Sequence, residues 1–301
     1  NEFLLSGSFS SFEELKRKTD DIYINDIDGN SSSYLANYVR KFGNDSEFNI
    51  ILKSIDKNTD SIYTDYNAST SYTASNDLTE SKRTAISTGI DWKSEENSAF
   101  DGVKLQVYKN DMRYENEYQV RNTADSSDDE NTIDDLNQDS FGINIQLTND
   151  IKGENFNQKI TYGFEGSKLD GSRLRTKFEI DDDKTSEYKS NPDSETTKLG
   201  FYIQDEISTD KWDFIVGLRY ETVDMDATSD DAWFATDEVT NMAGQGGFNK
   251  DVIGEPNDFN DGHLAPSLKA LYRFNEDTNI YAKYDRGFRA PTWDEFNSSR
   301  I

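Results

Sequence analysis

The chain has 301 residues, of which 33% are hydrophobic, and its 59 acidic and 32 basic side chains give a formal net charge of −27. Such a charge argues against nucleic acid as a partner, because phosphate backbones bind to a basic face. Cysteine is absent, which excludes disulfides, thiolate metal sites and cysteine nucleophiles. Low hydrophobicity and high charge are typical of disordered chains, but 16 Tyr, 18 Phe and 4 Trp indicate an ordered protein.

His263 is the only histidine of the sequence. A multi-histidine metal site is therefore excluded, and a Ser-His-Asp triad is possible only there. We expect no enzyme, no metal site and no cofactor. Since no stretch approaches 18 consecutive apolar residues, the sequence also predicts no transmembrane helix.

Apolar and polar residues alternate in short runs along the chain, with the period of a β-strand that has one apolar face. From 212 to 221, Trp212, Phe214 and Leu218 share one face, whereas Asp213 and Arg219 share the other. Helical periodicity is best over residues 12–18, a short segment. The pattern predicts about eleven strands, which begin with 2–10 and end with 279–286 and include 84–92, 103–107, 141–148, 160–164, 199–203 and 268–274.

The predicted connections alternate between short and long. The short ones lie at 43–46, 93–101, 150–155, 208–211 and 275–277, and the long polar ones at 58–80, 122–138, 170–196 and 227–262. An antiparallel meander with short turns at one edge and long loops at the other is typical of an outer-membrane barrel. A soluble β-sandwich has no reason to sort its loops in this way.

Aromatic residues cluster beside the short turns. This placement predicts a girdle at a membrane interface, because a soluble core would bury its aromatics at mid-strand. Eleven strands with two free edges would not seal a barrel, since bacterial barrels normally have an even strand count. We therefore predict an all-β, antiparallel, up-and-down transmembrane barrel, with residues 1–301 forming one part of a larger barrel domain. The aromatics concerned are Phe42, Phe48, Trp92, Phe100, Phe156, Trp212, Phe214, Tyr272 and Phe274.

Four segments near the end of the chain carry a resemblance to a known family. Residues 199–207 and 212–220 resemble a consecutive strand pair of the TonB-dependent outer-membrane receptors, and 264–272 resembles the next strand. Residues 279–292, with Phe288-Arg289-Ala290-Pro291, resemble the FRAP box of that family. The segments follow one another in the family's order and spacing, whereas residues 1–195 agree only in pattern.

The resemblance implies a barrel of about 22 strands with a plugged lumen. It also implies an outer-membrane location in a Gram-negative bacterium, with membrane lipid and lipopolysaccharide around the wall. The function would be energy-coupled import of an iron chelate, such as a siderophore, or of haem or cobalamin. We expect the signal peptide, the plug, the TonB box that contacts TonB and the strands after the FRAP box to lie outside these 301 residues.

Two residues are candidates for contact with a ligand. His263 has the strand parity of Ser267, Lys269 and Arg273, which we assign to the lumen face at the loop end of the strand. Neutral imidazole binds haem iron well, and the alternative is an ordinary polar residue at the base of a loop. Arg289 of the FRAP box is the second candidate, and its alternative is structural hydrogen bonding where the strand leaves the wall.

Two further features have simple explanations. The acidic runs at 125–130, 134–135 and 181–183 have oxygen ligands suited to calcium but lack the spacing of an EF-hand loop, so solvated loop acid is favoured. They would also suit divalent bridging to lipopolysaccharide phosphates. Residues 244–247 lack the Lys-Ser/Thr of a phosphate loop and are interpreted as linker. The alternatives to a receptor are a soluble acidic β-rich adhesin or carbohydrate-binding module and, less favoured, a barrel enzyme.

Overall fold

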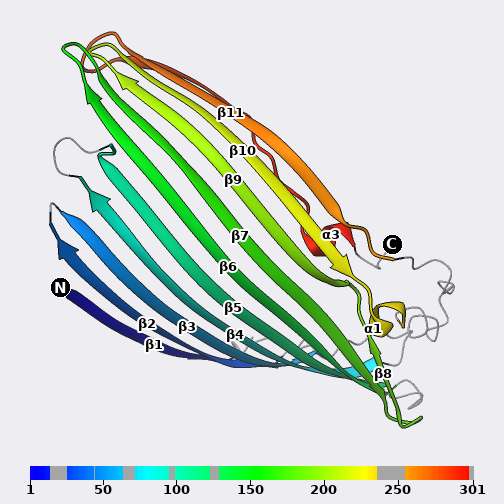
Figure 1. Cartoon of the computed structure of the whole chain (residues 1–301). Coiled ribbons are helices and arrows are strands. Elements are labelled where there is room, and N and C mark those ends of the chain that lie inside the picture. Colours follow the sequence, from blue (N-terminus) through cyan, green and yellow to red (C-terminus); the bar gives the residue numbers. More distant parts are fainter. Residues whose placement is uncertain are drawn as a thin grey trace.

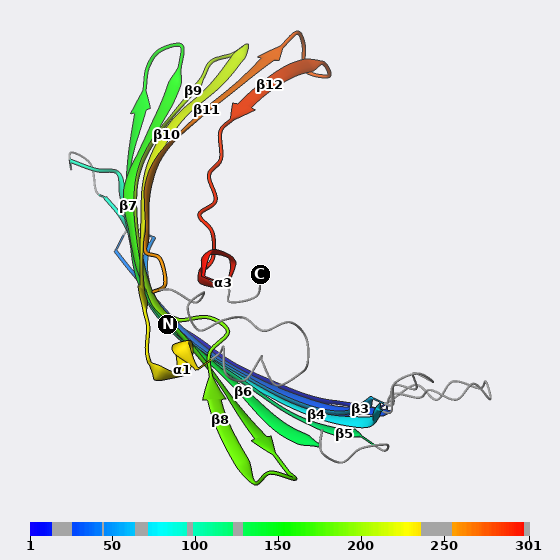
Figure 2. The same ribbon diagram turned by 90° about the vertical axis from the view of Figure 1, so that its right-hand side faces the viewer.

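The computed structural model describes residues 1–13, 26–43, 45–63, 72–94, 99–122, 129–235 and 255–297. They form a 12-stranded antiparallel sheet with the order β1-β2-β3-β4-β5-β6-β7-β9-β10-β11-β12, to which the short strand β8 adds by pairing with β7 (Figure 1). The sheet curves around an open concave side, as part of a barrel does (Figure 2). The predicted all-β, up-and-down partial barrel is confirmed.

The strands along this path are β1 (Glu2–Phe12), β2 (Asp26–Phe42), β3 (Ser46–Tyr63), β4 (Tyr72–Lys93), β5 (Gly102–Asn122), β6 (Glu130–Lys152), β7 (Asn157–Glu179), β9 (Asp193–Ser208), β10 (Trp212–Thr228), β11 (Phe259–Arg273) and β12 (Asn279–Asp285). Their number agrees with the predicted count of about eleven, and β8 (Lys184–Tyr188) was not predicted. The helices α1 (Asp231–Phe234) and α3 (Trp293–Phe296) have four residues each. In the described part of the chain, no helix is long and apolar enough to cross a membrane.

The predicted short turns are confirmed, and they lie at one edge of the sheet, which we call the short-turn edge (Figure 1). Three of the predicted long loops are wrong in extent, because β3, β4, β6 and β7 continue far into them. Polar residues occupy both faces of these strand extensions, which hides the alternation, while backbone hydrogen bonds still hold the strands together. In the fourth loop, residues 236–254 lie outside the described part.

The helix predicted over 12–18 is wrong at its start, because Phe12 is the last residue of β1. Residues 14–18 lie outside the described part of the chain.

The apolar face of the sheet is its convex, outward face. Along β10, the alternate residues from Trp212 to Tyr220 are between 37% (Phe214) and 52% (Val216) exposed. The register places Ile203 of β9 and Pro266 of β11 opposite Leu218, so this face continues across neighbouring strands. No second sheet packs on it among the described residues, an arrangement that does not favour a soluble sandwich.

Aromatic rings gather at the short-turn edge, as predicted. Trp212 stacks on Phe214 with a centroid distance of 5.3 Å, and its ring lies 4.5 Å from that of Tyr272. Tyr272 in turn meets Phe274 edge to face at 4.9 Å. Phe100 and Tyr162 form a further pair at 6.1 Å. In outer-membrane barrels, aromatic girdles lie in this position beside the turns.

Candidate functional site

The concave face is polar along the strands, and its first cluster of charged side chains surrounds Arg219 of β10. The Nη2 atom of Arg219 lies 2.6 Å from Oε2 of Glu165 on β7, and its Nε atom donates to Glu221 at 2.9 Å. The intervening strand β9 places Gly200 between them, and a Cβ there would lie 2.9 Å from Arg219 Nη2. Asn144 donates to the other Glu165 oxygen at 3.2 Å. Glycine on the middle strand therefore permits an ion pair between two strands that are not neighbours.

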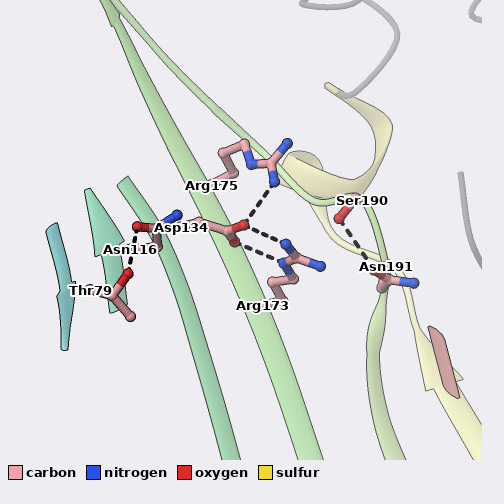
Figure 3. A network of polar contacts seen from close by, with 7 residues as sticks. All are labelled: Thr79, Asn116, Asp134, Arg173, Arg175, Ser190 and Asn191. Atoms are coloured by element: carbon pink, nitrogen blue, oxygen red, sulfur yellow. Dashed lines mark hydrogen bonds and ion pairs between the residues drawn. The ribbon is translucent and has the colours of Figure 1, made fainter. Parts of the chain in front are cut away.

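A second cluster lies on the same face, toward the edge opposite the short turns, and is centred on Asp134 (Figure 3). Arg173 donates from Nε to Asp134 Oδ1 at 2.8 Å and closes a second bond to Oδ2, to which Arg175 also donates at 2.7 Å. The Asp134 side chain is only 7% exposed. The Arg175 guanidinium also lies 5.7 Å from the ring centroid of Tyr188 on β8.

These contacts shift the protonation equilibria of the second cluster. Burial alone would raise the pKa of the Asp134 carboxyl, but the hydrogen bonds and charges of Arg173 and Arg175 hold it below its ordinary value. Burial opposes the charge of Arg175 as well, yet Asp134 and Tyr188 raise the pKa of this guanidinium. At neutral pH the cluster is one carboxylate held between two cations.

A small core covers the concave face beside this cluster. Met225 is 1% exposed and Trp233 of α1 is 5% exposed. Lys189 joins α1 to the sheet, because its backbone N–H donates to Ala232 at 3.0 Å and its ammonium binds Asp193 and Asp230 at 2.8 and 2.5 Å. Burial would lower the pKa of Lys189, but these two carboxylates raise it.

His263 lies on the concave face, opposite Glu221 in the register, as its parity predicted. Its ring stacks on Phe288 with a centroid distance of 4.3 Å and an interplanar angle of 16°. Its Nε2 atom is 3.3 Å from Nη2 of Arg286. The segment 286–297, which we call the return segment, leaves β12 and runs back along the concave side to α3 (Figure 2). Phe296 of α3 packs against Phe259 at the start of β11, with ring centroids 5.2 Å apart.

Arg289 lies within the return segment and is 72% exposed. Its guanidinium binds both carboxylate oxygens of Glu295, at 2.7 and 3.0 Å. The Thr292 N–H donates to the same carboxylate at 3.0 Å. Hydrogen bonds from Arg289 and Thr292 lower the pKa of Glu295 to about 2. His263 thus contacts Phe288, the chain neighbour of Arg289, while Arg289 itself turns to Glu295.

The sequence reasoning missed the cluster around Asp134. It identified residues 134–135 as solvated loop acid, and this interpretation is wrong for Asp134, which is buried on β6 between two arginines. The spacing of Arg173 and Arg175, two residues apart and hence on one strand face, was the available signal. No group of three or more His, Asp or Glu side chains in the described residues is arranged to hold a metal ion. Residues 125–128 and 244–247 lie outside the described part.

Comparisons with known structures find similar folds. The hemophore receptor HasR of Serratia marcescens, a double mutant in complex with the hemophore HasA and heme, matches with a TM-score of 0.61 at 12% identity over 96% of this chain and 41% of that chain. The copper transporter OprC matches with 0.65 at 12% identity, over 99% and 42%. The ferric citrate transporter FecA in its unliganded form matches with 0.50 at 11% identity, over 94% and 44%.

At such identities these likenesses show the fold alone, and the chain spans less than half the length of each of these proteins. No curated protein matches the sequence. The family description "TonB dependent receptor-like, beta-barrel" matches residues 17–300, nearly the whole chain. The chain therefore belongs to the family of TonB-dependent receptor β-barrels.

Proposed function

We propose that this chain forms part of an outer-membrane receptor that imports an iron-bearing ligand, a siderophore or haem, with energy supplied through TonB. The observation that carries the proposal is the division of the sheet into an exposed apolar convex face and a polar, ion-paired concave face. A wall of this kind suits lipid outside and a hydrated lumen inside. Among the compared proteins, HasR is in complex with its hemophore and heme, FecA is a ferric citrate transporter, and OprC is a copper transporter.

The sheet itself supports a larger barrel. Each strand on the path is antiparallel to the next, so the edge strands β1 and β12, at the two ends of an eleven-strand path, run in the same direction. Closing an antiparallel barrel between them needs an odd number of further strands. Eleven more would give the 22 of the family's large receptors, with a plug in the lumen. The contact with TonB belongs to a segment before the barrel in this proposal.

The proposed surroundings follow from the two faces. Membrane lipid and lipopolysaccharide would cover the convex face in the outer membrane of a Gram-negative bacterium. On the concave face, His263 with its stacked Phe288 is the proposed contact for an arriving ligand. A second histidine for a bis-imidazole site is absent from the sequence, so any metal bond needs a partner from the ligand or from other strands. Arg289 would act by holding the return segment through Glu295.

Growth of an iron-starved Gram-negative strain tests the proposal. The intact receptor that carries this chain, expressed in a strain without its own receptors, should restore growth on haem or on one ferric siderophore. Restoration should require TonB. The control is the same receptor in a strain without TonB. Location is checked separately, since the receptor should fractionate with outer membranes and migrate differently on gels before and after boiling. A receptor that reaches the membrane but raises only copper uptake would overturn the iron assignment.

A further inference from the structure

The convex face of β1–β4 carries a hollow of about 660 Å³. Its lining combines small side chains with larger apolar ones that remain exposed, and the carboxylate-bearing Asp111 of β5 lines its far side, opposite Thr84. The small side chains leave a depression in the convex face, and the larger side chains project beside it. The small residues are Gly7, Ala36, Ser54 and Thr84, and the larger ones are Leu5, Tyr34, Leu52 and Ile86. The registers place them in two adjacent rows that cross the four strands.

Two cations lie just beyond the hollow, on the side away from the short turns. The register of β4 with β5 is unbroken from Ile86 to Lys82, so Lys82 faces outward like Ile86 and stands directly opposite Arg113. Like charges in directly opposed positions destabilise a sheet unless other charges compensate them. Arg113 is held by Glu115 and Asp135, each at 3.1 Å. Lys82 makes no ion pair with any residue that the structure describes.

The height of the Lys82–Arg113 pair in a membrane follows from the length and tilt of β4. From Lys93, at the short-turn end of β4, to Lys82 the chain climbs roughly 25–30 Å, taking about 3.3 Å per residue and a tilt of about 40°. The apolar band of an outer-membrane barrel is about 25 Å tall. The short turns of such barrels face the periplasm, so height above them is measured toward the cell exterior. The hollow therefore lies within the band, in its outer half, and the two cations lie at the level of the outer head groups.

We propose that the hollow and the Lys82–Arg113 pair form a seat for a phosphorylated, acylated glycolipid of the outer leaflet. One acyl chain would occupy the hollow, and a phosphate would bind the Lys82 ammonium and the Arg113 guanidinium. Three carboxylates on the same face add negative charge: Asp56 opposite Lys82 on β3, Glu80 two residues from Lys82 on β4, and Asp111 in the lining of the hollow. Phosphate binding should therefore depend on Mg²⁺, which would bridge these carboxylates to the phosphate. The seat rests on the outer-membrane location proposed above and assigns the lipid to one place on the wall.

Lipid A is the probe for this seat, with phosphatidylcholine as the zwitterionic comparison. The intact receptor that carries this chain, purified in mild detergent, is incubated with each lipid, and the retained lipid is measured by native mass spectrometry. The wild type should retain lipid A in preference. Lys82→Glu, which reverses the charge, and Ser54→Leu, which fills the hollow with an apolar group, should each lower retention by about tenfold.

Two matched variants serve as controls. Thr88→Leu makes a similar change on the convex face of β4, outside the hollow, and Lys269→Glu reverses an exposed charge on the concave face. Both should retain lipid A like the wild type. Equal retention of the two lipids by the wild type would overturn the seat, as would wild-type retention by both Lys82→Glu and Ser54→Leu. Each variant is also run on gels before and after boiling. A variant that keeps the change in migration but loses lipid A has lost the seat alone, whereas loss of the change in migration means loss of the barrel, on which the proposed function depends.

Discussion

Arg219 of β10 forms an ion pair with Glu165 of β7, across the whole width of β9. The two residues are 54 positions apart in sequence, and their contact depends on Gly200, which places no side chain between them. The concave face is thereby connected across three strands by side chains as well as by backbone hydrogen bonds.

Substitution of Gly200 tests this connection. In Gly200→Ala the new Cβ would meet the end of the flexible Arg219 side chain at 2.9 Å, so the arginine should move and its bond to Glu165 should weaken. The expected loss is small, about 0.5–1 kcal/mol, since the pair is partly hydrated. Urea unfolding of the intact receptor in detergent should show that Gly200→Ala adds little once Arg219 is alanine. Gly287→Ala, where a Cβ would have no neighbour within 4 Å, is the control.

The assignment of faces predicts opposite behaviour for two adjacent residues. Leu218 faces outward and Arg219 faces the lumen. Leu218→Arg should therefore cost on the order of 2–4 kcal/mol if Leu218 lies near the bilayer midplane. Arg219→Leu should cost less, because the lumen face is hydrated. The free energy of unfolding in lipid vesicles measures both, and equal or reversed costs would contradict the assignment.

The Asp134 cluster predicts a specific response to acid. The pKa of Asp134 lies below its unfolded value, so its contribution is complete above the usual aspartate pKa of about 3.9 and is lost as pH falls through the folded pKa. Asp134→Asn should lower the free energy of unfolding at pH 7 by about 1–3 kcal/mol. The same substitution should also flatten the dependence of the free energy of unfolding on pH below about 4.

Asp135→Asn is the control for this measurement, because Asp135 is the next residue and binds Arg113 on the opposite, convex face. It should change stability by less than about 1 kcal/mol, as exposed ion pairs do. If the free energy of unfolding of Asp134→Asn follows pH in parallel with that of the wild type, the Asp134 carboxylate makes no pH-dependent contribution to stability.

His263 predicts a moderate effect on ligand binding. His263→Ala in the intact receptor should weaken binding of the imported ligand by about tenfold or less, roughly 1.4 kcal/mol. Phe288→Ala should give a similar loss, since the two rings are stacked. Titration of the purified receptor with the ligand identified by the growth test measures both variants. Complete loss with the barrel still folded would make His263 the principal ligand, and no change would leave it a polar residue at a loop base.

Local patterns in the sequence were sufficient for much of the fold. Strict alternation around Leu218 and Arg219 predicted which residue faces which side, because successive strand residues must point to opposite faces. The aromatics beside the short turns predicted one membrane interface. The lengths of the strands were not predictable in this way. Where β6 and β7 extend beyond the apolar band, both faces are polar, and only pairing with neighbouring strands keeps the chain extended.

The polar clusters depended on the tertiary structure. Asp134 stands in an acidic stretch that resembles solvated loop, and it becomes buried only because the register places Arg175 opposite it and Arg173 within reach. Those arginines are 39 and 41 positions away, and no local pattern sets that register. The sequence by itself determined that a one-sided wall would form and which residues face outward. Which charges meet on the concave face was decided by strand pairing, because side chains on different strands come together only after the backbone hydrogen bonds align them.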